Sequence, residues 1–313
     1  MKVKDVEVRI KEFVGLLPKT VSVVAYGSGV VHQDGEQKND KKQIDLIVIV
    51  DKIKDFYKES LKQNKKMYPA IPKLYFRLAS AKRLKKAAGI CYTSGIKYGE
   101  DTFKVGVIEK STVLSDLENW DTFYLAGRFH KERCIIEEDK DIEKANERNK
   151  DNATLVALIL LNKENPTLLD LYEQICSLSY IGDSRKKFKA EDPNKVRNIV
   201  IGSKKFLDRE YRDRLPLFTI SKDEHITIKT KEALKAIPQL PERLKDKIDS
   251  RVHGNYEPEN IEDIRTSIVE FLTEVNKKSS LGQTVKGVFT TGPKEAVGYA
   301  LRKLQKGRNK KQQ

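Results

Sequence analysis

A glycine turn and an acidic residue stand at the ends of two predicted strands near the start of the chain. Gly27, Ser28 and Gly29 follow a β-branched run, and Asp45 lies at the start of the apolar run 44–50. The backbone N–H groups of such a turn can bind phosphate oxygens, and the Ser28 hydroxyl can add a hydrogen bond. A carboxylate on the second strand can hold Mg²⁺ against the same oxygens. The pattern therefore indicates transfer of a nucleotidyl group.

Each half of this pattern also has a simpler interpretation. Gly27 to Gly29 could form a β-turn between strands, and Asp45 could be an exposed strand end. A second acid two residues after Asp45 would share its face of the strand, but that position is Ile47. Asp51 lies about 20 Å further along the strand at ~3.3 Å per residue, so we expect it to end the strand. A second carboxylate must come from elsewhere in the chain. The candidates are Glu109, Asp116 and Asp183.

Several cations could neutralise a triphosphate or an anionic acceptor. Arg128, His130 and Lys131 form one cluster, Lys97 lies at a predicted strand end, and Lys195 lies near a predicted helix N-terminus. The alternative interpretation is that these residues are ordinary helix-end cations and surface side chains. We predict that Asp45, Lys97, Arg128 and Lys131 are catalytic and that Asp45 is the metal ligand. The predicted nucleotide-binding residues are Gly27, Ser28, Gly29, His130, Asp183 and Lys195.

The composition limits the class of protein and its partners. The chain has 313 residues, of which 38% are hydrophobic and 34% charged, and its formal net charge is +15. These values are typical of a globular protein whose partners are anionic: nucleotide, nucleic acid or an acidic membrane surface. The three cysteines form no CxxC pair, so a disulfide scaffold or a zinc site is not expected. We expect neither a signal peptide nor a membrane-spanning segment.

The predicted elements change in character near residue 140. Before it, a helix over residues 6–17 precedes strands over 20–26, 44–50, 89–98 and 103–108, and Ser115 with Glu118 has the spacing of a capping box. After it, helices over 141–162, 166–180, 192–215 and 258–278 dominate, with a short strand over 226–229. We therefore predict an α/β fold with a mixed-sheet domain over 1–140, a mainly helical domain over 141–255 and C-terminal helices over 256–313.

The C-terminal tail has the pattern of a basic amphipathic helix. Val297, Ala300, Leu301 and Leu304 fall on one stripe. The cations around that stripe are Lys294, Arg302, Lys303, Lys306, Arg308, Lys310 and Lys311. Such a helix suits an anionic lipid surface, and the alternative is a helix packed on the body of the protein with a charged end.

Eight segments, taken in order, resemble the mitochondrial translocator assembly and maintenance family of CDP-diacylglycerol synthases. The resemblance spans residues 22–306. The matching segments are 26–30, 44–47, 96–99, 116–120, 124–131, 180–183, 191–200 and 279–288. Residues 52–72 match only loosely, and we expect a bacterial member of the family.

The resemblance implies a nucleotidyltransferase domain followed by a winged-helix-like domain, with CTP between them and a C-terminal segment on the membrane. It implies that CTP and phosphatidate give CDP-diacylglycerol and pyrophosphate with Mg²⁺, and that no nucleic acid is required. The expected location is cytoplasmic and peripheral on the inner face of the cell membrane, or the matrix side of the inner membrane in a mitochondrion. Two alternatives remain: a nucleotidyltransferase that acts on RNA, and a non-catalytic nucleotide-binding module for which Ile47 is the supporting feature.

Overall fold

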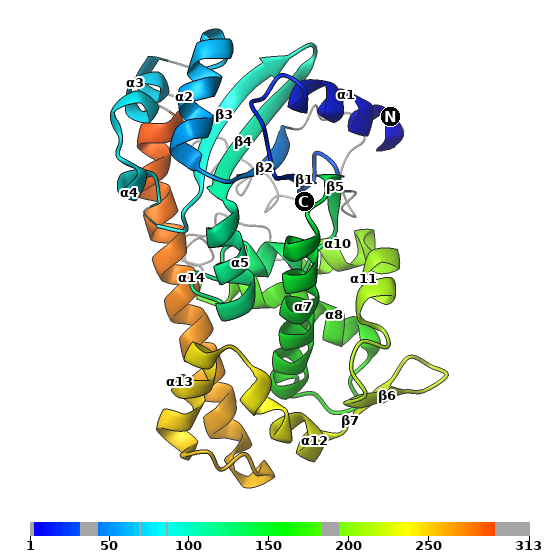
Figure 1. The fold of residues 1–313 in the computed structure, drawn as a ribbon. Helices are drawn as coiled ribbons and strands as arrows, with labels where there is room; N and C mark the ends of the chain where they lie inside the picture. Colours follow the sequence, from blue (N-terminus) through cyan, green and yellow to red (C-terminus); the bar gives the residue numbers. More distant parts are fainter. Residues whose placement is uncertain (1–2, 32–42, 69, 86, 183–193, 292–313) are drawn as a thin grey trace, which may run out of the picture.

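A five-stranded mixed sheet forms the centre of the N-terminal half in the computed structural model (Figure 1). The structure describes residues 3–31, 43–68, 70–85, 87–182 and 194–291. The strand order is β3-β4-β2-β1-β5; β2 and β4 are parallel and the other pairs antiparallel. The strands are β1 (Ser22–Tyr26), β2 (Ile44–Val50), β3 (Cys91–Tyr98), β4 (Asp101–Glu109) and β5 (Arg133–Glu137).

The central strand β2 is apolar on both faces because helices cover both sides of the sheet. Ile47 and Ile49 belong to one hydrophobic core, and Leu46 and Val48 belong to the other. The helices that contribute to the second core are α1 (Val3–Val14), α2 (Ile53–Gln63), α3 (Ala70–Leu78) and α4 (Ala81–Leu84). Those that contribute to the first core include α5 (Lys110–Asn119), α6 (Ala126–Phe129), α7 (Lys140–Leu160) and α8 (Leu168–Ser177).

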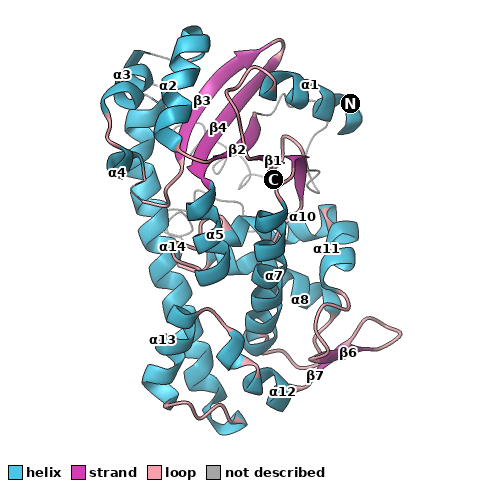
Figure 2. Cartoon of the chain, viewed as in Figure 1, coloured by secondary structure: helices cyan, strands magenta, loops and turns pink. Residues whose placement is uncertain are grey.

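The C-terminal half is mainly helical, with one short hairpin (Figure 2). The single-turn helix η2 (Leu178–Tyr180) follows α8, and the hairpin pairs β6 (Phe218–Ile220) with β7 (Ile226–Ile228). The remaining α-helices of this half are α10 (Lys195–Gly202), α11 (Lys204–Tyr211), α12 (Thr230–Lys235), α13 (Glu242–Val252) and α14 (Ile261–Thr291), and η3 (Ile237–Gln239) and η4 (Pro258–Asn260) are single turns between them. The mixed α/β class is as predicted, whereas the winged-helix character and the three-domain division stay predictions.

The long helix α14 joins the two halves of the molecule. It packs against α13 and α7 in the helical half, and then against β3 and α3 (Figure 1). Gln283 donates a side-chain hydrogen bond to the carbonyl oxygen of Ile90 over 3.3 Å. A Cβ atom on Gly282 would lie 2.7 Å from the Cβ of Ala87, so the helix approaches this loop closely because the residue is glycine.

Several predicted elements differ from those of the structure. Ser115 and Glu118 do not open a helix, because α5 begins five residues before Ser115 and the Ser115 hydroxyl instead donates to Asp121. Strands β5 and β6 were not predicted, and the helix expected to end at residue 278 continues to Thr291. The predicted start of a helix at 192, and the tail after 291, lie outside the described residues.

Candidate active site

The glycine turn and Asp45 lie side by side in the structure. Tyr26, the last residue of β1, pairs with Asp45 on β2, so the antiparallel register brings the turn to the start of β2. Gly27 has a φ of +78°, and a Cβ atom on it would lie 3.3 Å from the Asp45 Oδ2. A Cβ atom on Gly29 would lie 2.5 Å from the carbonyl oxygen of Gln43. The turn therefore approaches the Asp45 carboxylate at Gly27 and the backbone before β2 at Gly29 because both residues are glycine.

A lysine on the neighbouring strand faces the same carboxylate. Lys104 is the β4 partner of Asp45 in the parallel pair, and its Nζ lies 3.4 Å from the Asp45 Oδ1. The same ammonium lies over the ring of Tyr92, 4.5 Å from its centroid. The Asp45 side chain is 27% exposed, so one of its oxygen atoms can still meet a ligand.

Tyrosine side chains lie next to Asp45 and Lys104. The hydroxyl groups of Tyr26 and Tyr92 are 3.1 Å apart, and burial followed by the nearby charge of Asp45 raises the pKa of Tyr26. Arg128 stacks on Tyr124, with its guanidinium carbon 3.6 Å from the ring centroid, and donates to the Tyr124 carbonyl oxygen over 2.5 Å. The stacked ring and the hydrogen bond hold the guanidinium in one orientation.

Two lysines complete a cationic corner around Tyr180. Lys131 lies 4.6 Å and Lys195 lies 5.2 Å from the centroid of the Tyr180 ring. Lys131 also donates hydrogen bonds to the Gly127 carbonyl oxygen over 3.1 Å and to the Ser179 hydroxyl over 2.5 Å. Burial lowers the pKa of Lys131, and the charges of Arg128 and Lys195 lower it further. Like charges gathered in a half-buried corner favour the binding of an anion there.

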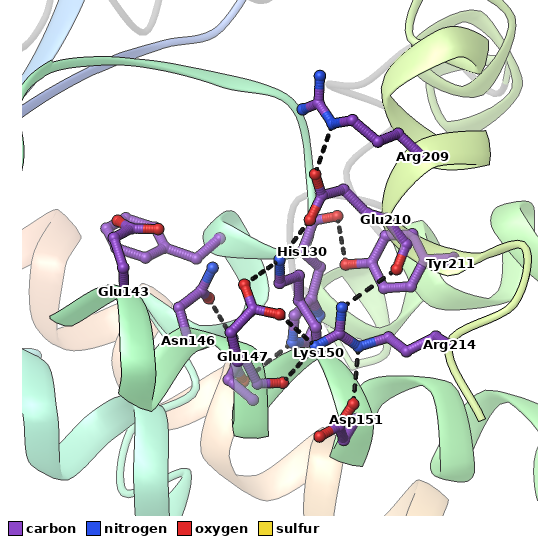
Figure 3. Close-up of polar contacts among 12 residues, drawn as sticks. His130, Glu143, Asn146, Glu147, Lys150, Asp151, Arg209, Glu210, Tyr211 and Arg214 are labelled. Carbon is purple, nitrogen blue, oxygen red and sulfur yellow. Dashed lines mark hydrogen bonds and ion pairs between the residues drawn. The ribbon is translucent and has the colours of Figure 1, made fainter. Parts of the chain in front are cut away.

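His130 does not belong to this corner, although it was predicted to bind the nucleotide. Its side chain is fully buried, and its Nε2 lies 3.0 Å from the Asn149 Oδ1, which also accepts a hydrogen bond from the Trp120 indole over 2.9 Å. Asn149 donates its amide protons to Ala126 and Asn146, so the histidine Nε2 must be the donor. Figure 3 shows His130 among polar residues of α7 and α11. Burial lowers its pKa to about 3, so it stays neutral near pH 7.

Other predicted residues lie apart from Asp45 or outside the described part of the chain. Lys97 is exposed on β3, two strands from Asp45 in the sheet order. Glu109 accepts from the Ile53 N–H and pairs with Lys85 at the far end of the sheet. Asp183 lies outside the described residues.

Asp116 is also unavailable as a second metal ligand. Its carboxylate is buried and accepts hydrogen bonds from the backbone N–H groups of Thr122, Leu125 and Ala126. Across residues 3–31, 43–68, 70–85, 87–182 and 194–291, no group of three or more His, Cys, Asp or Glu residues is placed to hold a metal ion. Mg²⁺ in nucleotide sites commonly takes one or two carboxylates and completes its shell with phosphate oxygens and water. Asp45 beside the glycine turn fits that donor set.

Lys104 and Tyr92 lie at the candidate site, although neither was predicted there. The sequence contains a signal for Lys104. Side chains alternate between the two faces of β4, so Lys104 lies on the same face as Gly106 and Ile108. The missing information was the parallel register of β2 and β4, which places residue 104 beside residue 45.

In the part of the chain that the structure describes, no helix has the length and the apolar character needed to cross a membrane.

A family model and several known proteins match most of this chain. The family model described as "Phosphatidate cytidylyltransferase, mitochondrial" matches residues 10–306. A protein of that name from Schizosaccharomyces pombe is 31% identical over 91% of this chain and 79% of its own length. Proteins of the same name from Caenorhabditis elegans and Xenopus laevis are 27% and 28% identical, each over 95% of this chain and over 97% and 94% of their own lengths. The chain therefore belongs to the mitochondrial phosphatidate cytidylyltransferase family.

Proposed function

We propose that this protein transfers the cytidylyl group of CTP to phosphatidate, which gives CDP-diacylglycerol and pyrophosphate. The observation that carries the proposal is the match of the family model to residues 10–306, within which the glycine turn and Asp45 lie side by side. Relatives at 27–31% identity over most of the chain have the name of this enzyme. The cationic corner of Arg128, Lys131 and Lys195 supplies the positive charge that a triphosphate and a lipid phosphate require.

The reaction is an in-line substitution at phosphorus. A phosphate oxygen of phosphatidate attacks the α-phosphorus of CTP, a new P–O bond forms, and the bond from the α-phosphorus to the bridging oxygen breaks. The electron pair of that bond leaves with pyrophosphate. The attacking phosphate is already anionic near pH 7, so no strong general base is needed. A neutral, fully buried His130 is consistent with this requirement.

Each predicted group has a separate part in positioning and charge neutralisation. Asp45 would hold Mg²⁺, which when bound neutralises triphosphate oxygens. The backbone of Gly27 to Gly29 would hold the triphosphate beside Asp45. Arg128, Lys131 and Lys195 would bind the remaining phosphate oxygens and stabilise the charge that develops on the leaving pyrophosphate.

The lipid substrate requires contact with a membrane surface. The proposal assigns this contact to the basic C-terminal tail, whose cations Arg302, Lys303 and Lys306 follow α14 in the sequence. The protein would then be peripheral on an anionic membrane.

The test is to incubate purified protein with Mg²⁺, CTP labelled in the cytidine moiety and liposomes that contain phosphatidate. Label in the lipid fraction, with an equal amount of pyrophosphate released, is the expected result. Omission of phosphatidate should abolish both products. Pyrophosphate release without labelled lipid would show that the acceptor is water or another molecule, and would overturn the proposal.

A further inference from the structure

Two exposed leucines stand on the outer side of α3. Leu74 is 57% exposed and Leu78 is 71% exposed. They are four residues apart in one helix and so lie on the same face. On the inner side, Phe76 is buried and stacks on Tyr57 of α2 at a centroid distance of 3.7 Å. Because Phe76 packs against α2, the opposite face of α3 with both leucines points outward.

Lys54 of α2 fixes the end of α3. Its ammonium donates to the carbonyl oxygens of Phe76, Arg77 and Ala79, at distances from 2.7 to 3.3 Å. These carbonyl groups lie at and just after the C-terminal turn of the helix, where backbone acceptors lack intrahelical partners. Contacts with α2 thus hold α3 in place, and they leave Leu74 and Leu78 exposed to solvent on its outer side.

A groove between α2 and α3 has a cationic rim. It has a volume of about 670 Å³, and its lining includes Leu61 and Leu74 together with Lys58, Lys73 and Arg77, with no acidic residue. The charged residues in the sequence from α3 to β3 are all cationic. No Asp or Glu occurs between Glu59 and Glu100, whereas ten Lys or Arg residues do. Apolar side chains set among cations suit an anionic amphiphile.

Helix α14 ends next to α3. The two helices are in contact, and Figure 1 shows the last described turns of α14 beside α3. The described chain stops at Thr291, and 22 further residues follow it in the sequence, with seven cations among residues 294–311. The described end of α14 and the α2–α3 surface therefore lie on one side of the molecule, and the basic tail follows α14 in the sequence.

We propose that Leu74, Leu78 and the surrounding cations of α2 and α3 form a membrane-docking surface for anionic phospholipid. The leucines would enter the interface between head groups and acyl chains while Lys58, Lys73 and Arg77 contact lipid phosphates. This surface acts in addition to the C-terminal tail. The inference rests on the proposed function in one respect, because a lipid-phosphate substrate gives the protein a reason to bind a bilayer.

The test is co-sedimentation of the full chain with phosphatidylcholine vesicles that do or do not contain phosphatidylglycerol. This assay contains neither CTP nor phosphatidate, so its result does not depend on the proposed activity. Reversal of two cations in Lys73→Glu/Arg77→Glu should weaken binding to the anionic vesicles by about 30-fold or more. Leu74→Gln/Leu78→Gln should weaken it about tenfold and leave the salt dependence in place.

Matched variants exist at the other end of the molecule. Lys231→Glu/Lys235→Glu reverses two exposed lysines of α12 and changes the charge by the same amount, and Val269→Gln removes an apolar side chain that is 42% exposed on α14. Both control variants should bind the vesicles like the unmodified protein. Turnover of phosphatidate in detergent micelles, together with the circular dichroism spectrum, shows that the docking variants are folded.

The outcomes separate this inference from the proposed function. Equal vesicle binding by the α3 variants and the unmodified protein would overturn the docking surface, even if the enzyme is active. Equal losses in the α12 and α3 variants would also overturn it, because only total charge would then matter. Absence of labelled lipid in the activity assay, with the α3 effect intact, would instead overturn the proposed function.

Discussion

His130 is fully buried, unlike its charged neighbours in the segment 128–131. It lies between Arg128 and Lys131, which contribute to the cationic corner, yet its imidazole points into the core and bonds with Asn149. The two cations lie over the rings of Tyr124 and Tyr180 at the candidate site, while the histidine fixes the segment to α7. Tyr211 strengthens the attachment by donating to the His130 carbonyl oxygen over 2.8 Å.

The buried histidine predicts a dependence of stability on pH. Its pKa is about 3 in the folded protein, against about 6.5 when unfolded, so the unfolded chain binds more protons between these values. The contribution of His130 to stability is therefore complete above pH 6.5 and falls as the pH is lowered towards 3. At pH 5 the loss from this group should be about 2 kcal/mol.

Urea unfolding at pH 7 and pH 5 measures this effect. His130→Gln keeps a donor for Asn149 and should lose about 2 kcal/mol less stability between the two pH values than the unmodified protein. His253→Gln, in an exposed position, should show the full loss. Identical pH dependence in all three proteins would contradict the buried neutral histidine.

At the scale of the element, the turn after β1 and the start of β2 act as one unit. The antiparallel register of Tyr26 with Asp45 fixes the position of the carboxylate relative to the turn. Neither a glycine turn nor an aspartate is specific by itself. Their specificity comes from the pairing of β1 with β2, and the spacing of these residues in the sequence does not establish that pairing.

Gly27→Ala should separate the geometry of this unit from its stability. A side chain at φ +78° costs about 1–2 kcal/mol, and the new Cβ would lie 3.3 Å from the Asp45 Oδ2. Because that contact displaces the carboxylate, kcat/KM for CTP should fall at least tenfold. Gly95→Ala is the matched control: Gly95 has a φ of +77°, and its new Cβ would meet no atom within 4 Å. It should lose similar stability and keep its activity; equal activity in both variants would contradict the role of the turn.

The sequence predicted elements where one local signal dominates. The apolar run of β2 and the stripe of α1 are of this kind, and both are found in the structure. Strand β5 was missed because it is an edge strand with partly exposed side chains and no clear alternation. The spacing of Ser115 and Glu118 gave a wrong helix start because a capping-box pattern also occurs inside a helix. The contact of Lys104 with Asp45 depends on long-range strand pairing, which local patterns do not reveal.

At the scale of the whole molecule, α14 connects what the sequence suggests are separate parts. It packs on α13 and α7, and also on β3 and α3, so unfolding of one half exposes surface on the other. The helix also ends at the side where the docking surface is proposed. We therefore expect the described body of the protein to unfold cooperatively.

Gly282→Val tests this connection. The added side chain would overlap Ala87 at the point where α14 meets the loop before β3, which should cost about 1–3 kcal/mol of unfolding free energy. The midpoint of urea unfolding should fall equally by circular dichroism and by the fluorescence of Trp120, the single tryptophan. Leu281→Val, at a neighbouring residue that is 50% exposed, should change the midpoint little. Two separated transitions in the unmodified protein would contradict the cooperative connection.

The central claim is that Asp45 carries the metal-dependent chemistry in nucleotidyl transfer. The most direct measurement compares Asp45→Asn with Asp51→Asn in the labelled-CTP assay, because Asp51 is an exposed aspartate just past the other end of β2. We predict that Asp45→Asn lowers kcat/KM by about 10²–10³-fold or more and that Asp51→Asn leaves it unchanged. Full turnover by Asp45→Asn, with normal dependence on Mg²⁺, would contradict the account.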